Sequence, residues 1–133
     1  MSAALVEAWV AAYNDRDWSA MRAVLAPGCV YEEIVKPPRR IEGADAIVAV
    51  FAAWAKAMPD PHARAVAMID GGDRIAMEFA LEGTESPFGD FRPSGHPPRT
   101  FGAIMFTFAD NRISEFRAYL DSLALFQVMG IRN

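Results

Sequence analysis

The stretch TFGAIMFTFADNRISEFRAYLD, residues 100–121, decides the fold that the sequence predicts. Its first half is apolar enough for a strand that is covered on both faces, and the Asp-Asn pair at residues 110–111 predicts a turn. In the second half, Arg117, Tyr119 and Asp121 fall on one side of a strand, and the apolar residues 116, 118 and 120 fall on the other. The pattern predicts two long antiparallel strands. It leaves open whether the polar side faces solvent or lines a pocket.

Outward from this hairpin, the sequence predicts further strands and four helices. RIAMEFALEGT, residues 74–84, alternates between apolar and polar residues, and Gly-Gly-Asp at 71–73 joins it to a strand at 62–70. CVYEEIV, residues 29–35, is predicted as the first strand and KPPRRIEG, residues 36–43, as a polar loop. Helical spacing predicts helices at about residues 2–14, 17–26, 44–57 and 122–130, with Asp17 as the cap of the second.

Helices that precede a run of strands indicate an α+β fold. We expect a curved antiparallel β-sheet that wraps around the N-terminal helices and forms a cone with an apolar pocket, a natural place for a small molecule. The 133 residues predict a single domain, residues 1–133.

Composition excludes several classes of partner. The net charge is −4 and the charges are interspersed, so the chain lacks the basic patch that nucleic acid requires. No apolar run reaches the roughly 18 residues of a membrane span, and the start does not resemble a signal peptide. With one cysteine, Cys29, no internal disulfide is possible, so we expect a cytoplasmic protein. Neither His62 nor His96 has a partner at metal-ligand spacing, so we expect no metal and no cofactor.

The order of elements and several strings resemble the nuclear transport factor 2-like (cystatin-like) superfamily. Within it, the chain is most similar to the SnoaL-like polyketide cyclases and the proteins related to ketosteroid isomerase. The strings are AWVAAYNDRDWSAM (8–21), IEGADAIVAVFAAW (41–54), MPD (58–60), GDRIAMEF (72–79), GTESPFGDF (83–91) and FTFADNRISEFRAYLDSLALFQVMG (106–130). The resemblance implies the cone fold, a small apolar ligand, a homodimer, and any of several cofactor-free reactions.

The resemblance also implies particular site residues. The carboxylate that closes the last strand of the cyclases matches Asp121, but the cyclase histidine falls near Thr107. The first-strand carboxylate of the isomerases matches Glu33, and their oxyanion donors fall on Trp9 and about Ile104. The chain therefore keeps the acids of both families and replaces several of their partners.

Each of these residues also has a purely structural interpretation. Asp121 is either a general acid or base or the N-cap of the last helix. Glu33 either enters the cone beside Tyr31 or lies at a solvated strand edge, and Arg117 either contacts a ligand or forms a cross-strand ion pair. The aromatic residues of the helices are core, pocket lining or both. The predicted catalytic residues are Asp121 and Glu33, and the predicted ligand contacts are Trp9, Tyr13, Tyr31, Phe51, Trp54, Met77, Thr107, Arg117 and Tyr119.

Three functions follow from this interpretation. The first is proton transfer on an apolar cyclic or aromatic carbonyl compound, leading to isomerisation or aldol-type cyclisation. The second is non-catalytic binding of such a compound in the same pocket. The third is an interaction domain that dimerises through an apolar outer face of FGAIMFTF, residues 101–108.

Overall fold

A computed structural model describes residues 2–34, 38–57, 62–82 and 99–120 of the chain. The described elements are three helices and six strands. In chain order they are α1 (Ser2–Asp15), α2 (Trp18–Val24), β1 (Leu25–Ile34), β2 (Arg39–Glu42), α3 (Ala44–Ala57), β3 (His62–Asp70), β4 (Arg74–Glu82), β5 (Arg99–Ala109) and β6 (Arg112–Leu120). The predicted helix at 122–130 and Asp121 lie outside the described residues.

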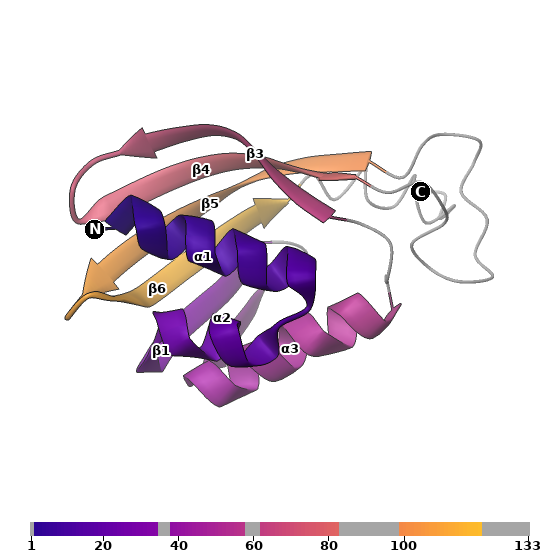
Figure 1. Ribbon diagram of the computed structural model, residues 1–133, viewed down its shortest axis with the longest axis horizontal. Coiled ribbons are helices and arrows are strands. Elements are labelled where there is room, and N and C mark those ends of the chain that lie inside the picture. Colours follow the sequence, from indigo (N-terminus) through magenta and orange to yellow (C-terminus); the bar gives the residue numbers. More distant parts are fainter. Residues whose placement is uncertain (1, 35–37, 58–61, 83–98, 121–133) are drawn as a thin grey trace.

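The six strands form one curved sheet in the order β2-β1-β6-β5-β4-β3, and the helices lie on one of its faces (Figure 1). The expected α+β architecture is confirmed, but the sheet is mixed and not purely antiparallel. Strand β1 pairs with β6 in parallel, whereas the other four strand pairs are antiparallel. Turn signals predicted the antiparallel pairs β3–β4 and β5–β6, but β1 and β6 are far apart in the chain, so no local signal reports their direction.

The helices bury an aromatic stripe against the concave face of the sheet. In α1 the buried positions are Val6, Trp9, Ala12 and Tyr13, which recur at helical spacing. Helix α2 begins after Asp17, whose carboxylate accepts a hydrogen bond of 3.0 Å from the backbone N–H of Ala20, so the predicted cap is confirmed. The core is therefore the space between these helices and the sheet.

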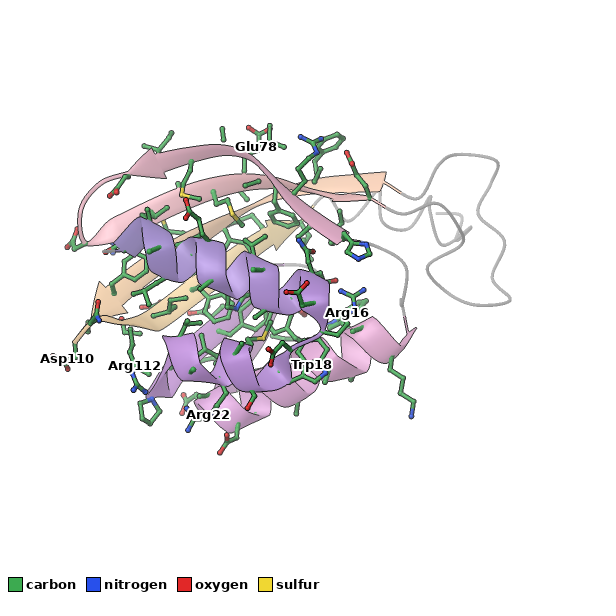
Figure 2. All side chains as sticks on the ribbon, viewed as in Figure 1. Arg16, Trp18, Arg22, Glu78, Asp110 and Arg112 are labelled. Atoms are coloured by element: carbon green, nitrogen blue, oxygen red, sulfur yellow. The ribbon has the colours of Figure 1, made fainter. Side chains whose placement is uncertain are left out.

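The strands alternate between this core and the outer face. In β4, residues Ile75, Met77 and Phe79 are buried, while Glu78 is exposed on the face away from the helices (Figure 2). In β6, Phe116 and Ala118 are buried and Tyr119 is 43% exposed. The polar side of β6 is therefore the outer face of the sheet.

Strand β2 lies in the segment that was expected to be a polar loop, so that expectation was wrong. Its residues Arg39 and Arg40 lie directly opposite Glu33 and Glu32 of β1. Charged residues suit a sheet edge and give no alternating apolar pattern, which explains why the sequence did not reveal the strand. Strand β1 also begins earlier than predicted, at Leu25 instead of Cys29.

Candidate functional site

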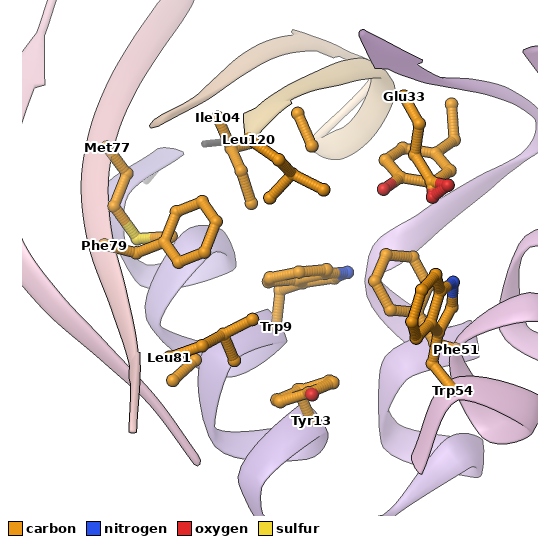
Figure 3. Close-up of a pocket in the computed structure, with 13 residues that line it drawn as sticks. Trp9, Tyr13, Glu33, Phe51, Trp54, Met77, Phe79, Leu81, Ile104 and Leu120 are labelled. Carbon is orange, nitrogen blue, oxygen red and sulfur yellow. The ribbon is translucent and has the colours of Figure 1, made fainter. Parts of the chain in front are cut away.

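A largely apolar pocket of about 80 Å³ lies between the helices and the concave face of the sheet (Figure 3). Helix α1 contributes Trp9 and Tyr13, and α3 contributes Phe51 and Trp54. The strand residues that line it are Tyr31, Glu33, Ala63, Met77, Phe79, Leu81, Ile104, Ala118 and Leu120. Of the described lining residues, Glu33 alone carries a formal charge.

Trp9 lies in the middle of this aromatic environment. Its ring centroid is 5.3 Å from that of Phe51 and 5.6 Å from that of Phe116, both in edge-to-face geometry. These contacts fix the indole plane. The residue is only 3% exposed, yet its Nε1–H has no hydrogen-bond partner among the described residues. An unpaired buried donor is costly, so this N–H is available to an acceptor that enters the pocket.

The indole nitrogen points toward the side of the pocket on which Glu33 and Phe51 lie (Figure 3). Glu33 is 3% exposed, and it projects inward because it shares the buried face of β1 with Cys29 and Tyr31. A carboxylate in such a place needs a counter-charge. A donor and a carboxylate therefore face one apolar cavity from different elements.

Arg39 supplies the counter-charge from the edge strand β2. Its Nε and Nη2 lie 3.0 Å and 2.5 Å from Glu33 Oε1, and Nη2 is also 3.0 Å from Oε2. The side chain of Arg39 is 47% exposed, whereas that of Glu33 is 4% exposed. The ion pair thus joins a buried anion to a partly hydrated cation.

Tyr31 adds a hydroxyl to this polar corner. Burial raises its pKa strongly, and the neighbouring Glu33 carboxylate raises it further, while Arg39 acts in the opposite direction. The phenol is therefore protonated at neutral pH, and its hydroxyl can act as a hydrogen-bond donor.

The structure brings together seven of the predicted site residues at this pocket: Trp9, Tyr13, Tyr31, Glu33, Phe51, Trp54 and Met77. Their roles as ligand contacts and, for Glu33, as a catalytic group remain predictions. Asp121 lies outside the described residues.

The other three predicted contacts do not line the described pocket: Thr107, Arg117 and Tyr119. Strand alternation places Arg117 and Tyr119 on the outer face, because Ala118 and Leu120 take the inner one. Arg117 lies 4.0 Å from Glu115 of its own strand, so this contact is not the cross-strand ion pair that was expected.

Sequence reasoning missed Arg39 and several wall residues, including Phe79, Leu81 and Leu120. The alternation of β4 was a usable signal for Phe79 and Leu81. Arg39 had no such signal, because its place beside Glu33 depends on a strand that was predicted as a loop.

The described residues do not group three or more histidine, cysteine or acidic side chains in a way that would hold a metal ion. Among the described helices, none combines the length and the apolar character needed to cross a bilayer. The polar side chains of the described pocket lining are the Glu33 carboxylate, the phenols of Tyr13 and Tyr31 and the indoles of Trp9 and Trp54, within otherwise apolar walls.

Comparison with known families agrees with this architecture. The SnoaL-like domain model matches residues 6–116, which is most of the chain. The chain belongs to the SnoaL-like domain family. No curated protein matches this SnoaL-like chain in sequence.

Solved structures share the fold of this SnoaL-like domain at low sequence identity. A hypothetical protein from Catenulispora acidiphila, with a ketosteroid isomerase-like fold and in complex with trimethylamine, has a TM-score of 0.82 at 16% identity, over 96% of this chain and 93% of that one. IdmH of Streptomyces antibioticus, a candidate polyketide cyclase, has a TM-score of 0.81 at 22% identity, over 97% and 98%. An LEH-like epoxide hydrolase of M. tuberculosis has a TM-score of 0.74 at 20% identity, over 94% and 86%. At such identities these likenesses show the fold alone.

Proposed function

We propose that this SnoaL-like protein binds a small apolar carbonyl compound in the pocket and that Glu33 transfers a proton on it. The observation that carries the proposal is that a buried carboxylate and the Trp9 N–H, which has no partner in the described part of the chain, face the same apolar cavity. A base and an oxyanion donor are the two groups that enolisation requires.

The proposed step requires only the ligand and the residues of the pocket. Glu33 takes a proton from the carbon next to the carbonyl, and the C–H electron pair forms the carbon–carbon double bond of the enolate. The carbonyl π electrons move to the oxygen, which accepts a hydrogen bond from Trp9 Nε1. Return of the proton to another carbon gives isomerisation, and attack of the enolate carbon on a second carbonyl gives aldol-type cyclisation.

General principles give the size of these contributions. A positioned acid or base typically accelerates a reaction by about 10²–10⁴-fold, and one oxyanion donor contributes about 3 kcal/mol to transition-state stabilisation. Asp121, predicted from the family position to be a second acid or base, remains a prediction.

The volume of the pocket limits the ligand. The cavity of about 80 Å³ is roughly half the size of an engineered cavity of about 150 Å³ that holds benzene. We therefore infer that the carbonyl end of a ligand fits first, and that a larger ring system requires wall side chains to move. Trp54, which is half-buried, is the aromatic wall residue with the most freedom to do so.

Deuterium exchange of cyclohexanone tests the proposal without knowledge of the natural substrate. In D₂O, the protein is expected to speed the loss of the α-proton NMR signal, and Glu33→Gln is expected to remove most of that acceleration. Glu32→Gln is the matched control, because Glu32 is the adjacent acid on the opposite face and pairs with Arg40 at 3.3 Å. Equal loss in both variants, or exchange that Glu33→Gln leaves intact, contradicts the proposal.

One observation favours the second candidate, a binding protein without catalysis. Arg39 donates to both oxygens of Glu33, so much of the capacity of this carboxylate as a base is occupied. In that case Glu33→Gln changes the affinity for cyclohexanone and the exchange rate stays at the level of buffer.

The homodimer remains part of the proposal. The outer face carries exposed apolar side chains at Val66, Ile69, Phe101 and Tyr119, of which Ile69 is 73% exposed. Size-exclusion chromatography with light scattering measures the mass directly, and a monomer contradicts this part. The cytoplasmic location likewise stays a prediction from the single cysteine.

A further inference from the structure

The net charge of the pocket and its surroundings depends on Arg39, which does not itself line the pocket. Glu33 carries the charge of the described pocket lining, and Arg39, which lies opposite it across the β1–β2 pair, neutralises it through two nitrogen atoms. The arginine reaches Glu33 from the sheet edge and keeps its own side chain 47% exposed. The pocket and its immediate neighbour are therefore neutral as a pair.

We propose that Arg39 determines the specificity of this pocket for uncharged ligands. It acts through Glu33: it cancels the carboxylate charge, so a neutral carbonyl compound is favoured over an ammonium or a carboxylate of the same shape. The inference rests on the proposed function, because it concerns the ligand of the same pocket.

The aromatic walls of the pocket explain why Arg39 has a large effect on the binding of charged ligands. The faces of Trp9, Tyr31 and Phe51 are electron-rich, and aromatic faces beside a buried carboxylate are the usual environment for binding an alkylammonium ion. With Arg39 in place, a cation finds the carboxylate already paired and loses its hydration without full compensation. An anion finds Arg39 already paired with Glu33, meets electron-rich aromatic faces, and loses its hydration without compensation.

A neutral carbonyl compound avoids both costs. Its apolar part packs against the aromatic walls, and its oxygen accepts from Trp9 Nε1, for which the described residues provide no acceptor. The same geometry predicts what happens when Arg39 is removed: the aromatic walls and Glu33 then form a site for a cation.

Three probes of one shape test this inference: cyclohexanone, cyclohexylammonium and cyclohexanecarboxylate at pH 7. Their dissociation constants are measured from the ¹⁵N-indole NMR signal of Trp9, which also reports that the probe is in this pocket. The wild-type protein is expected to bind the ketone at least about tenfold more tightly than either ion, a difference of about 1.4 kcal/mol.

Variants of Arg39 then distinguish the effect of its positive charge on ligand affinity from the effect of its shape. Arg39→Met is expected to raise the affinity for cyclohexylammonium about tenfold, Arg39→Lys is expected to keep the wild-type order, and Arg39→Met with Glu33→Gln is expected to lose the gain. An unchanged order of the probes in Arg39→Met overturns the inference. If Arg39→Met does not fold, the wild-type order decides, because preference for either ion overturns the inference without any mutation.

The experiments distinguish failure of the proposed proton transfer by Glu33 from failure of the proposed role of Arg39. The expected order of probes without Glu33-dependent deuterium exchange supports the role of Arg39 and contradicts only the proton transfer. Absence of binding by all three probes overturns the role of Arg39 and the proposed ligand together.

Discussion

The side chain of Asn14 forms two hydrogen bonds with the backbone of Ala63. Its Nδ2 donates to the carbonyl oxygen at 2.8 Å, and its Oδ1 accepts from the N–H at 2.7 Å. The side-chain amide thus pairs with the backbone of β3 as a neighbouring strand would. It connects the start of this edge strand to the end of α1. Since Ala63 also lines the pocket, this contact positions one of its walls.

Replacement of Asn14 by alanine is expected to lower the free energy of unfolding by about 1–3 kcal/mol. The reason is that both backbone groups of Ala63 are part-buried and lose their partner. Urea denaturation measures the change. Ser19→Ala, at an exposed position of α2, is the control and is expected to stay within about 0.5 kcal/mol of the wild type. Equal stability of the two variants would show that the Asn14 contact does not hold β3.

Removal of the Trp9 N–H without a change of shape is expected to stabilise the free protein and weaken ligand binding. Incorporation of benzothienylalanine at position 9 replaces the N–H by sulfur, which removes a buried donor that no described residue pairs with. We expect a gain of about 1–2 kcal/mol in the free energy of unfolding and about tenfold weaker binding of cyclohexanone.

The same replacement at Trp18, which packs at the edge of the core and does not line the pocket, is the control for Trp9. It is expected to leave the affinity for cyclohexanone unchanged. Thermal unfolding and NMR titration provide the two readouts. Full retention of affinity in the position-9 variant would exclude Trp9 Nε1 as the ligand's donor.

Gly102→Ala is expected to be strongly destabilising because there is no space for a methyl group. A Cβ at this position would lie 2.5 Å from the carbonyl oxygen of Tyr119 and 2.8 Å from Cζ of Phe79, a wall residue of the pocket. We expect a loss of about 1–3 kcal/mol, measured by urea denaturation.

Gly28→Ala is the matched control for Gly102→Ala, because a Cβ at Gly28 would have no atom of the described residues within 4 Å. It is expected to be neutral or to stabilise by up to about 1 kcal/mol. Similar effects at both glycines would mean that close approach to Phe79 and Tyr119 is not the cause.

Alkaline pH is expected to destabilise the fold through Cys29. Burial raises the pKa of this thiol to about 12, and the nearby Glu115 carboxylate contributes in the same direction. The folded state therefore holds the proton more tightly than the unfolded chain, whose thiol ionises near pH 8.5. The contribution is fully present below that pH and is lost as the pH rises toward 12.

Unfolding free energies measured from pH 7 to 11 check this expectation. Cys29→Ala is expected to show a shallower decline above pH 8.5 than the wild type. The remaining decline is expected from Tyr31 and Tyr13, because burial raises the pKa of both phenols. Identical pH profiles for Cys29→Ala and the wild type would contradict the assignment to the thiol.

Local periodicity was enough for most of the elements. The apolar stripe of α3 predicted a helix over residues 44–57, where the structure has it, and the alternation of β4 gave the correct inner face. It failed for β2, because a short charged edge strand has the same composition as a loop. The isomerase-like position suggested Glu33, which lines the pocket in the structure, whereas the polar side of the last strand suggested Arg117 and Tyr119, which alternation places outside.

The sequence by itself therefore determined the three described helices, most of the described strands, the α+β class and the aromatic and acidic residues available to a pocket. Only the tertiary structure decided that β1 and β6 run in parallel, that Arg39 neutralises Glu33, and that the Trp9 N–H is left without a described partner. The physical reason is how far apart in the chain the interacting residues lie. Periodicity arises from neighbours within a few residues of the chain, whereas the pairing of strands and charges depends on contacts that form only when distant segments pack together.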